Sequence, residues 1–209
     1  MIEIVDNAVQ LLVTTGCAVW AGALAARRKS QAYFILACFY GTFALGVLFW
    51  LSYLVIMTYT PKIFYVSDLS WFASFLFLML LSASLSEPQE RLYKPLAPWV
   101  VAALPTAATI YFLFLGDIIG TLLWCPLLIV CTYHSAKGFL YAHSQHGEQR
   151  RRQWIYLAIL FVIFTEFTLW TLSYFFKSST IQNPYFWCDF MLSASLFMLM
   201  PAMKNVVDS

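Results

Sequence analysis

The sequence predicts an all-α integral membrane protein with seven transmembrane helices. Three observations predict this class: an apolar composition, seven apolar segments about as long as a membrane span, and basic residues confined to alternate loops. Hydrophobic residues make up 62% of the 209 residues and charged residues only 11%, with a mean hydropathy of +0.75. A soluble domain is about half apolar and about a quarter charged. A chain this short cannot bury so much apolar surface in water, so the excess must face lipid.

Seven apolar segments follow one another along the chain. A bilayer core of roughly 30 Å requires about 20 residues of apolar helix. Polar loops divide the sequence into segments near that length: Asn7–Ala26, Tyr33–Met57, Leu69–Leu85, Leu96–Leu115, Ile118–Tyr141, Trp154–Phe176 and Trp187–Met203. The first residues, Met1–Asp6, lack the basic region that opens a secretory signal, so we expect the first segment to be kept as a span.

The basic residues predict the orientation, because cytoplasmic loops of membrane proteins carry an excess of lysine and arginine. If the seven segments alternate, the residues that fall on one side are Arg27, Arg28, Lys29, Arg91, Lys94, Lys137, Arg150, Arg151, Arg152 and Lys204. Only Lys62 and Lys177 fall on the other side. We therefore expect a cell-membrane protein with its N-terminus outside and its C-terminus in the cytoplasm. A net charge of +2 gives no indication of a nucleic-acid partner.

The chain also contains an internal repeat pattern. A shift of 121 residues lays the second and third segments over the sixth and seventh. The matched positions are Ser52-Tyr53 with Ser173-Tyr174, Asp68 with Asp189, Ala73-Ser74 with Ala194-Ser195 and, after a slip of one residue, Trp50 with Trp170. A shorter shift matches Asp6 with Asp117. We therefore expect one polytopic domain in which residues 1–86 and 117–204 form two three-helix bundles of the same orientation, joined by a linker helix at 95–115.

This parallel 3+1+3 layout resembles the seven-span superfamily that includes the SWEET sugar transporters, the PQ-loop proteins, the PnuC vitamin transporters and, more distantly, the microbial rhodopsins. The resemblance covers most of the chain as architecture and implies a transport protein. The family motifs are absent. The Pro88-Gln89 pair lies in a loop, Pro126 has Thr15 near its counterpart, and Trp187–Met203 contains no lysine for retinal. No family residue is therefore carried over, and no cofactor is expected.

Glu166 is the first candidate site residue, because it lies near the middle of the segment Trp154–Phe176. An ionisable group at that depth costs several kcal/mol, roughly 2.5 to more than 10, and usually faces the bundle interior or a water path. Thr165 precedes it, and Ser173 lies seven residues later on the same helix face. Glu166 is therefore predicted to bind substrate or a proton. The alternative is a protonated carboxyl hydrogen-bonded to a neighbouring helix.

Asp68 and Asp189 begin the third and seventh segments at the outer surface. The free N–H groups of a helix's first turn stabilise carboxylates, so capping explains each residue alone. Each also follows a Ser-Tyr pair by fifteen or sixteen residues, which capping does not predict. The predicted substrate-binding set is therefore Glu166, Asp68, Asp189, Tyr53, Tyr174, Ser52, Ser173, Trp170 and Thr165. Asp6 and Asp117 add negative charge, and an acidic, aromatic mouth favours a cationic or amine-bearing solute.

These features favour a small-solute transporter or permease, for a cationic or aromatic molecule, in which a midplane carboxylate binds substrate or a proton. The alternative is a seven-span ligand-sensing receptor that couples to a cytoplasmic protein through the basic loop Ala142–Gln153. No hydrolase, zinc-protease or P-loop motif is present, so we do not expect an enzyme. No CxxC pair occurs, and His143 and His146 lack further ligands, so no metal is expected. The expected partners are membrane lipid and a small solute, with a homo-oligomer or a cytoplasmic protein left open.

Overall fold

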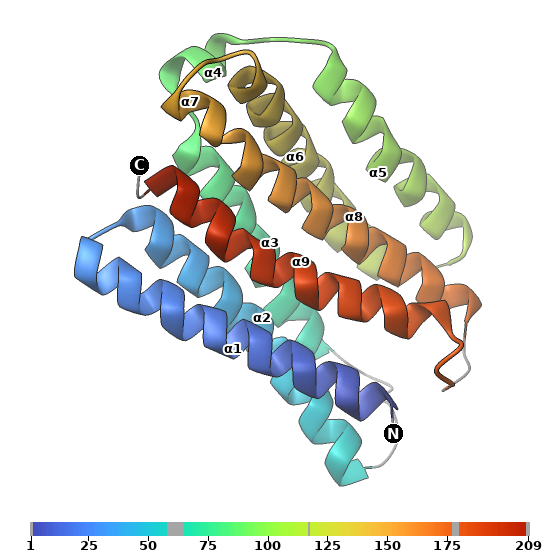
Figure 1. Ribbon diagram of the computed structural model, residues 1–209. Helices are drawn as coiled ribbons and strands as arrows, with labels where there is room; N and C mark the ends of the chain where they lie inside the picture. The colour runs from blue at the N-terminus through green and yellow to red at the C-terminus, as the bar shows by residue number, and fades with distance from the viewer. Residues whose placement is uncertain (1, 58–64, 117, 177–179, 208–209) are drawn as a thin grey trace.

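The computed structural model describes residues 2–57, 65–116, 118–176 and 180–207, and these residues are helical apart from short connections (Figure 1). The helices are α1 (Ile2–Arg28), α2 (Gln31–Met57), α3 (Tyr65–Leu85), α4 (Pro88–Leu92), α5 (Ala97–Phe114), α6 (Ile118–His143), α7 (Glu148–Arg151), α8 (Gln153–Phe175) and α9 (Pro184–Val207). No strand occurs in these ranges. In lipid, a helix satisfies every backbone N–H and C=O within one segment. The predicted all-α fold is confirmed.

Six of the described helices are long and apolar enough to cross a membrane: α1, α2, α3, α5, α8 together with α7, and α9. The prediction of a multi-pass membrane protein is confirmed at this level. The one predicted segment without a counterpart among these six is Ile118–Tyr141, the fifth along the chain. It lies within the long helix α6, which does not belong to that set of six. The short helices α4 and α7 lie in segments that we predicted as loops.

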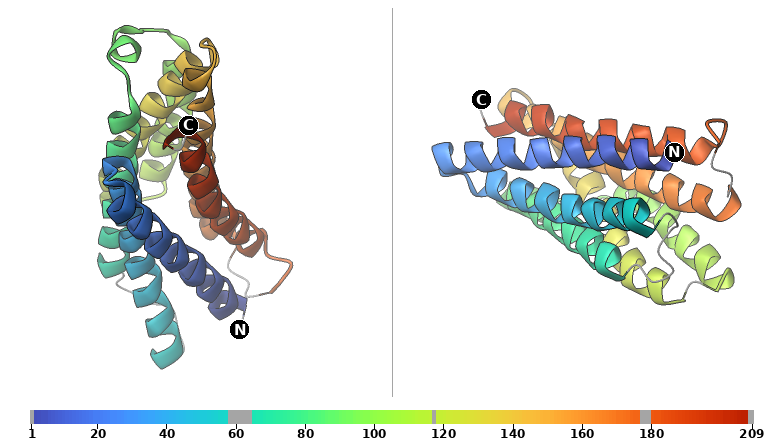
Figure 2. Two further views of the ribbon diagram at one scale, coloured as in Figure 1. Left: turned by 60° about the vertical axis from the view of Figure 1, so that its left-hand side comes forward. Right: turned by 90° about the horizontal axis from the view of Figure 1, so that it is seen from below.

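Six helices form a closed ring, and a seventh lies outside it. Each helix of the ring packs against the next in the order α1, α2, α3, α6, α8 and α9, and α9 packs back against α1. Helix α5 packs mainly against α6 from outside this ring (Figures 1 and 2). The first and last helices of the chain therefore lie side by side, which brings residues from its two ends into contact.

The core between α2, α3 and α6 is apolar and aromatic. Phe39 and Phe43 of α2 and Phe75 of α3 are buried. The ring centroids of Phe39 and Phe75 lie 6.5 Å apart, and those of Phe75 and Trp124 of α6 lie 5.5 Å apart, both edge to face. Aromatic pairs in this geometry gain about 0.5–1.5 kcal/mol beyond the area that they bury. Aromatic packing accordingly joins α2, α3 and α6 within the ring.

The two ends of the bundle differ in charge. The C-terminal ends of α1 and α9 lie on the same side of the bundle as the short helices α4 and α7 (Figure 1). We call this side the basic end. It carries the ten basic residues Arg27, Arg28, Lys29, Arg91, Lys94, Lys137, Arg150, Arg151, Arg152 and Lys204. The remaining two, Lys62 and Lys177, lie outside the described residues. Helices α1 and α9 begin at the opposite end.

Polar contacts tie α4, α7 and α8 together at the basic end. Arg152 Nη1 forms an ion pair with Glu87 Oε1 at 2.8 Å. Buried Glu90 accepts hydrogen bonds from the hydroxyls of Ser86 at 2.5 Å and Tyr156 at 3.1 Å. Lys137 of α6 donates to the backbone carbonyl of Arg91 at 3.1 Å. Glu87 and Glu90 therefore both have partners that donate to their carboxylates, as enclosed polar groups require.

The approach of α6 to α8 gives a stability prediction. A Cβ atom added at Gly138 would lie 2.4 Å from Cζ of Tyr156, closer than van der Waals contact allows. We expect Gly138→Ala to lower the free energy of unfolding by about 1–3 kcal/mol, the usual cost of overpacking. The measurement is the thermal unfolding midpoint of the purified protein in detergent.

Gly22→Ala in α1 is the matched control, because nothing lies within 4 Å of a Cβ at that position. Alanine favours a helix over glycine by about 1 kcal/mol, so this variant is expected to unfold at the wild-type midpoint or higher. Equal midpoints for the two variants would contradict the close contact between α6 and α8.

Candidate functional site

Helix α1 is polar on the side that faces the protein and apolar on the side that faces outward. Leu12 and Val19 are 75% and 69% exposed. The buried side carries a set of residues spaced about three or four apart, which we call the polar face of α1: Asp6, Asn7, Gln10, Thr14 and Cys17. Lipid offers no hydrogen bonds to such groups, so they must find partners inside the bundle.

The polar face of α1 meets an aspartate of α9. Gln10 Nε2 donates a hydrogen bond of 2.8 Å to Asp189 Oδ1. The Asp6 carboxyl lies within hydrogen-bonding reach of the Asp189 carboxyl, and we call these two residues the carboxyl pair. Asp6 is 1% exposed and Asp189 is 4% exposed. Two carboxyl groups can form a hydrogen bond with each other only when one of them carries a proton.

Two further carboxyl groups lie near the pair. Together with it they form what we call the acidic cluster: Glu3, Asp6, Glu166 and Asp189. Glu166 of α8 interacts electrostatically with Asp189, and the hydroxyl of Tyr185 lies within electrostatic reach of all four carboxyl groups. The Glu166 side chain is half-buried, but its Oε2 atom is enclosed and has no hydrogen-bond partner among the described residues. The cluster therefore joins α1, α8 and α9.

Among the described residues, no basic side chain acts on the carboxyl pair. Its electrostatic and hydrogen-bonding neighbours there include Asn7, Gln10, Glu3 and Glu166. In the same ranges, no three His, Cys, Asp or Glu side chains converge closely enough to hold a metal ion. Buried carboxylates are normally paired with a cation or neutralised. The cluster consequently concentrates acidic groups where α1, α8 and α9 meet.

The start of α9 positions its part of the site. Pro184 opens the helix, where its missing N–H costs nothing. Asn183 precedes it, and its Oδ1 accepts a hydrogen bond of 2.9 Å from the N–H of Tyr185. One turn further on, Cys188 Sγ lies 3.5 Å from the carbonyl oxygen of Thr165, which holds α9 against α8 beside Glu166. Asp189 lies about 8 Å along the helix from Pro184, at 1.5 Å per residue.

Of the predicted site residues, the structure brings Glu166, Asp189 and Thr165 together. Thr165 is buried, and its hydroxyl donates to the carbonyl of Phe161 in its own helix. Asp68 is half-buried in the first turn of α3, whose main neighbours are α2 and α6. It therefore belongs to a helix that does not adjoin α9 in the ring.

The other predicted residues lie in aromatic packing. The rings of Trp170 and Phe112 are stacked with centroids 4.6 Å apart, and Tyr174 lies 5.4 Å from the same phenylalanine, so both pack α8 against α5. Ser173 donates to the carbonyl of Trp170 at 2.7 Å. Tyr53 packs on Phe49 at 6.3 Å, and Ser52 lies beside it on α2.

Sequence reasoning missed most of the polar face of α1. From the sequence, Asp6 is predicted only to add negative charge at the outer surface, and no role is predicted for Asn7, Gln10 or Thr14. A helical signal was nevertheless present. Positions 7, 10, 14, 17 and 21 are polar or small and recur at intervals of three and four within an apolar segment. That spacing places them on one face of a helix, which a membrane protein turns towards its interior.

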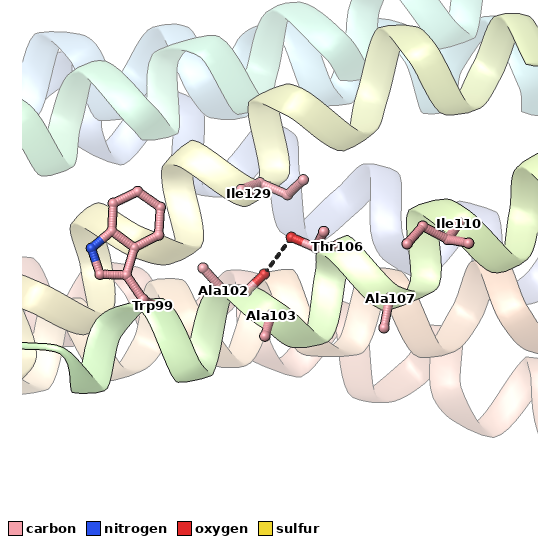
Figure 3. Close-up of a pocket in the computed structure, with 7 residues that line it drawn as sticks. All are labelled: Trp99, Ala102, Ala103, Thr106, Ala107, Ile110 and Ile129. Atoms are coloured by element: carbon pink, nitrogen blue, oxygen red, sulfur yellow. Dashed lines mark hydrogen bonds between the residues drawn. The ribbon is translucent and has the colours of Figure 1, made fainter.

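The surface also has two shallow apolar grooves. The larger, of about 410 Å³, runs between α5 and α6 and is lined by Trp99, Ala102, Ala103, Thr106, Ala107, Ile110 and Ile129 (Figure 3). Its one polar side chain, Thr106, donates its hydroxyl to the carbonyl of Ala102 at 2.8 Å. A second groove, of about 160 Å³, lies along α2 beside Tyr53. Neither lining includes a member of the acidic cluster, so neither groove is assigned to a polar solute.

The chain matches no protein-family model, no curated protein and no solved structure. Any function must therefore be inferred from the geometry of the acidic cluster and the arrangement of the helices around it.

The contact between Gln10 and Asp189 gives the prediction for this site. Gln10→Ala removes the amide that donates to a buried carboxyl, and an unsatisfied buried group costs about 1–3 kcal/mol. We expect a loss of that size in the free energy of unfolding. A double-mutant cycle with Asp189→Ala, which removes the acceptor, measures the part that belongs to the contact.

Gln31→Ala serves as the control, because Gln31 is exposed at the start of α2 and its truncation leaves no buried acceptor. If the losses from Gln10→Ala and Asp189→Ala add without coupling, α1 and α9 are not joined by this hydrogen bond.

Proposed function

We propose that the protein is a small-solute membrane transporter in which the acidic cluster binds a cationic solute or a proton. The observation that carries this proposal is the presence of four carboxyl groups within apolar helices, where no basic side chain of the described residues acts on the buried pair. Ionisable groups in membrane helices are costly and commonly mark substrate or proton pathways. Carboxylates, together with the nearby Tyr185 ring, suit an amine or quaternary ammonium group.

The helix arrangement supports a transporter built as two repeated halves. In this proposal α6 is the seventh span, and a parallel repeat would exchange α1 with α6, α2 with α8, and α3 with α9. The neighbour order of the ring is consistent with that exchange, since α3 adjoins α6 where α9 adjoins α1. Helix α5 would be the linker. The acidic cluster lies at one of the two junctions between the proposed halves, where a rocking motion would open and close a path.

The charge distribution supports an orientation. Lysine and arginine favour the cytoplasmic side of a membrane protein. We therefore place the basic end in the cytoplasm, the N-terminus outside, and the protein in the cell membrane. The acidic cluster would then lie in the outer half of the bilayer, and its negative charge would attract cations from outside. The buried carboxyl pair corresponds to a closed state, because α1 and α9 cover it.

Uptake into liposomes that contain the purified protein tests the proposal. We expect radiolabelled methylammonium or tetramethylammonium to accumulate under an imposed pH gradient, and Glu166→Gln to lower the initial rate by about ten-fold or more. The reason is the loss of a charge-assisted interaction of about 1.5–3 kcal/mol, of which each 1.4 kcal/mol is ten-fold.

Glu148→Gln is the matched control, because Glu148 is exposed on α7 at the basic end and should not alter uptake. Accumulation no greater than in protein-free liposomes for every probe would overturn the transport proposal. Wild-type rates in Glu166→Gln would remove only this residue from the mechanism.

The second candidate function is a seven-span receptor that couples to a cytoplasmic protein. The observation that favours it is a basic surface at the basic end. Arg150 and Arg151 of α7 are exposed there, and the ion pair of Arg152 with Glu87 holds the adjoining segments together. Such a surface is suited to an acidic partner. Under this hypothesis, a partner captured by the wild type is lost in a variant carrying Arg150→Glu and Arg151→Glu, and liposomes show no flux. Flux without a captured partner would exclude it.

A further inference from the structure

The hydrogen bonds around the carboxyl pair leave one acceptor without a donor. Asp6 Oδ1 accepts from the N–H of Asn7 at 2.7 Å and from its Nδ2 at 3.3 Å. Asp189 Oδ1 accepts from Gln10 at 2.8 Å. Asp6 Oδ2 is buried and has no donor among the described residues. The Asp189 carboxyl lies within hydrogen-bonding reach of the Asp6 carboxyl and can donate to it only if it is protonated.

Each group described around the carboxyl pair is either acidic or neutral, so none of them offsets a second negative charge. Helix α1 contributes Glu3, α8 contributes Glu166, and α9 contributes Tyr185 and Cys188, all of which interact electrostatically with members of the acidic cluster. Helix α2, which packs on α1, contributes the neutral indole of Trp50, whose Nε1 donates to Glu3 Oε1 at 3.4 Å. Two close carboxylates in such surroundings cannot both stay charged without a bound cation.

We propose that Asp6 and Asp189 together form a binding site for one exchangeable proton, shared between Asp6 Oδ2 and the Asp189 carboxyl. In the loaded state the pair carries a single negative charge, and release of the proton leaves two. The released state repels α1 from α9 and opens the junction that the shared proton closes. The role of this proton as the coupling ion rests on the proposed transport function, whereas its presence at the pair does not.

A proton fits the site better than a metal ion does. A metal would need more oxygen or nitrogen ligands than the two carboxyl groups supply, and no third acidic, histidine or cysteine side chain converges with them in the described ranges. Ser193, one turn after Asp189 on the same face of α9, is 4% exposed, and its hydroxyl has no hydrogen-bond partner among the described residues. This hydroxyl can accept the proton as it leaves the pair or donate to the carboxylate that remains.

Polar groups continue from the pair towards the basic end. Thr14 follows Gln10 by one turn and donates its hydroxyl to the Gln10 carbonyl at 2.8 Å. Cys17 lies within hydrogen-bonding reach of the Tyr40 hydroxyl, which donates to the carbonyl of Leu196 at 2.6 Å. These groups line the interior side of α1, and they provide the direction in which a proton would leave towards the cytoplasm.

Infrared difference spectroscopy of the purified protein in lipid nanodiscs tests the site without any transport assay. We expect a protonated-carboxyl C=O band at neutral pH that shifts in D2O and disappears at high pH. Both Asp6→Asn and Asp189→Asn should abolish it, because an asparagine amide donates to the remaining carboxylate and replaces the proton. The same amide keeps the junction satisfied, so both variants should retain the wild-type unfolding midpoint to within a few degrees.

Glu166→Gln and Glu148→Gln are the controls, and each should keep the band. The inference is overturned if the wild type has no such band, if the band disappears only with Glu166→Gln, or if only one of the two aspartate variants removes it, since the proton then belongs to one carboxyl alone. If the band behaves as expected but liposomes show no flux, the proton site stands and the transport function fails.

Discussion

The absence of hydrogen-bonding partners in lipid is the constraint on which this structure depends. Helix α1 carries several polar side chains within an apolar segment, and only the protein interior can satisfy them. Their inward orientation sets the rotation of α1, and the hydrogen bond from Gln10 to Asp189 fixes its pairing with α9. Closure of the six-helix ring therefore depends on a polar contact, whereas the rest of the ring is held by aromatic and aliphatic packing.

The two ends of the bundle differ in the partners that they offer to acidic side chains. At the basic end, Glu87 has an arginine and Glu90 has two hydroxyl donors, so both carboxylates are satisfied by the protein. At the other end, the carboxyl pair has amide donors for one oxygen of each residue, and no basic side chain of the described residues acts on it. An arrangement satisfied by the protein alone is suited to stability. Under the proposed proton site, the energy of the carboxyl pair would depend on the pH outside the protein, which is suited to a change of state.

The aromatic residues belong mainly to helix packing. Phe112 of α5 stacks on Trp170 of α8, which holds the outer helix against the ring, and Trp124 fills the space between α3 and α6. The groove between α5 and α6 is lined almost entirely by apolar side chains and is open to the surroundings. The high aromatic content therefore reflects packing between helices.

The sequence by itself determined the long apolar helices, because lipid imposes a continuous apolar length on each span. It did not determine which helices are neighbours. Gln10 and Asp189 are 179 residues apart in the chain, and nothing in their spacing indicates that the ring closes between α1 and α9. Tyr53 and Tyr174, two further predicted site residues, pack on Phe49 and Phe112. Only the tertiary structure decided that Asp6 meets Asp189, because the partner of a buried polar group is set by the packing of whole helices and not by local sequence.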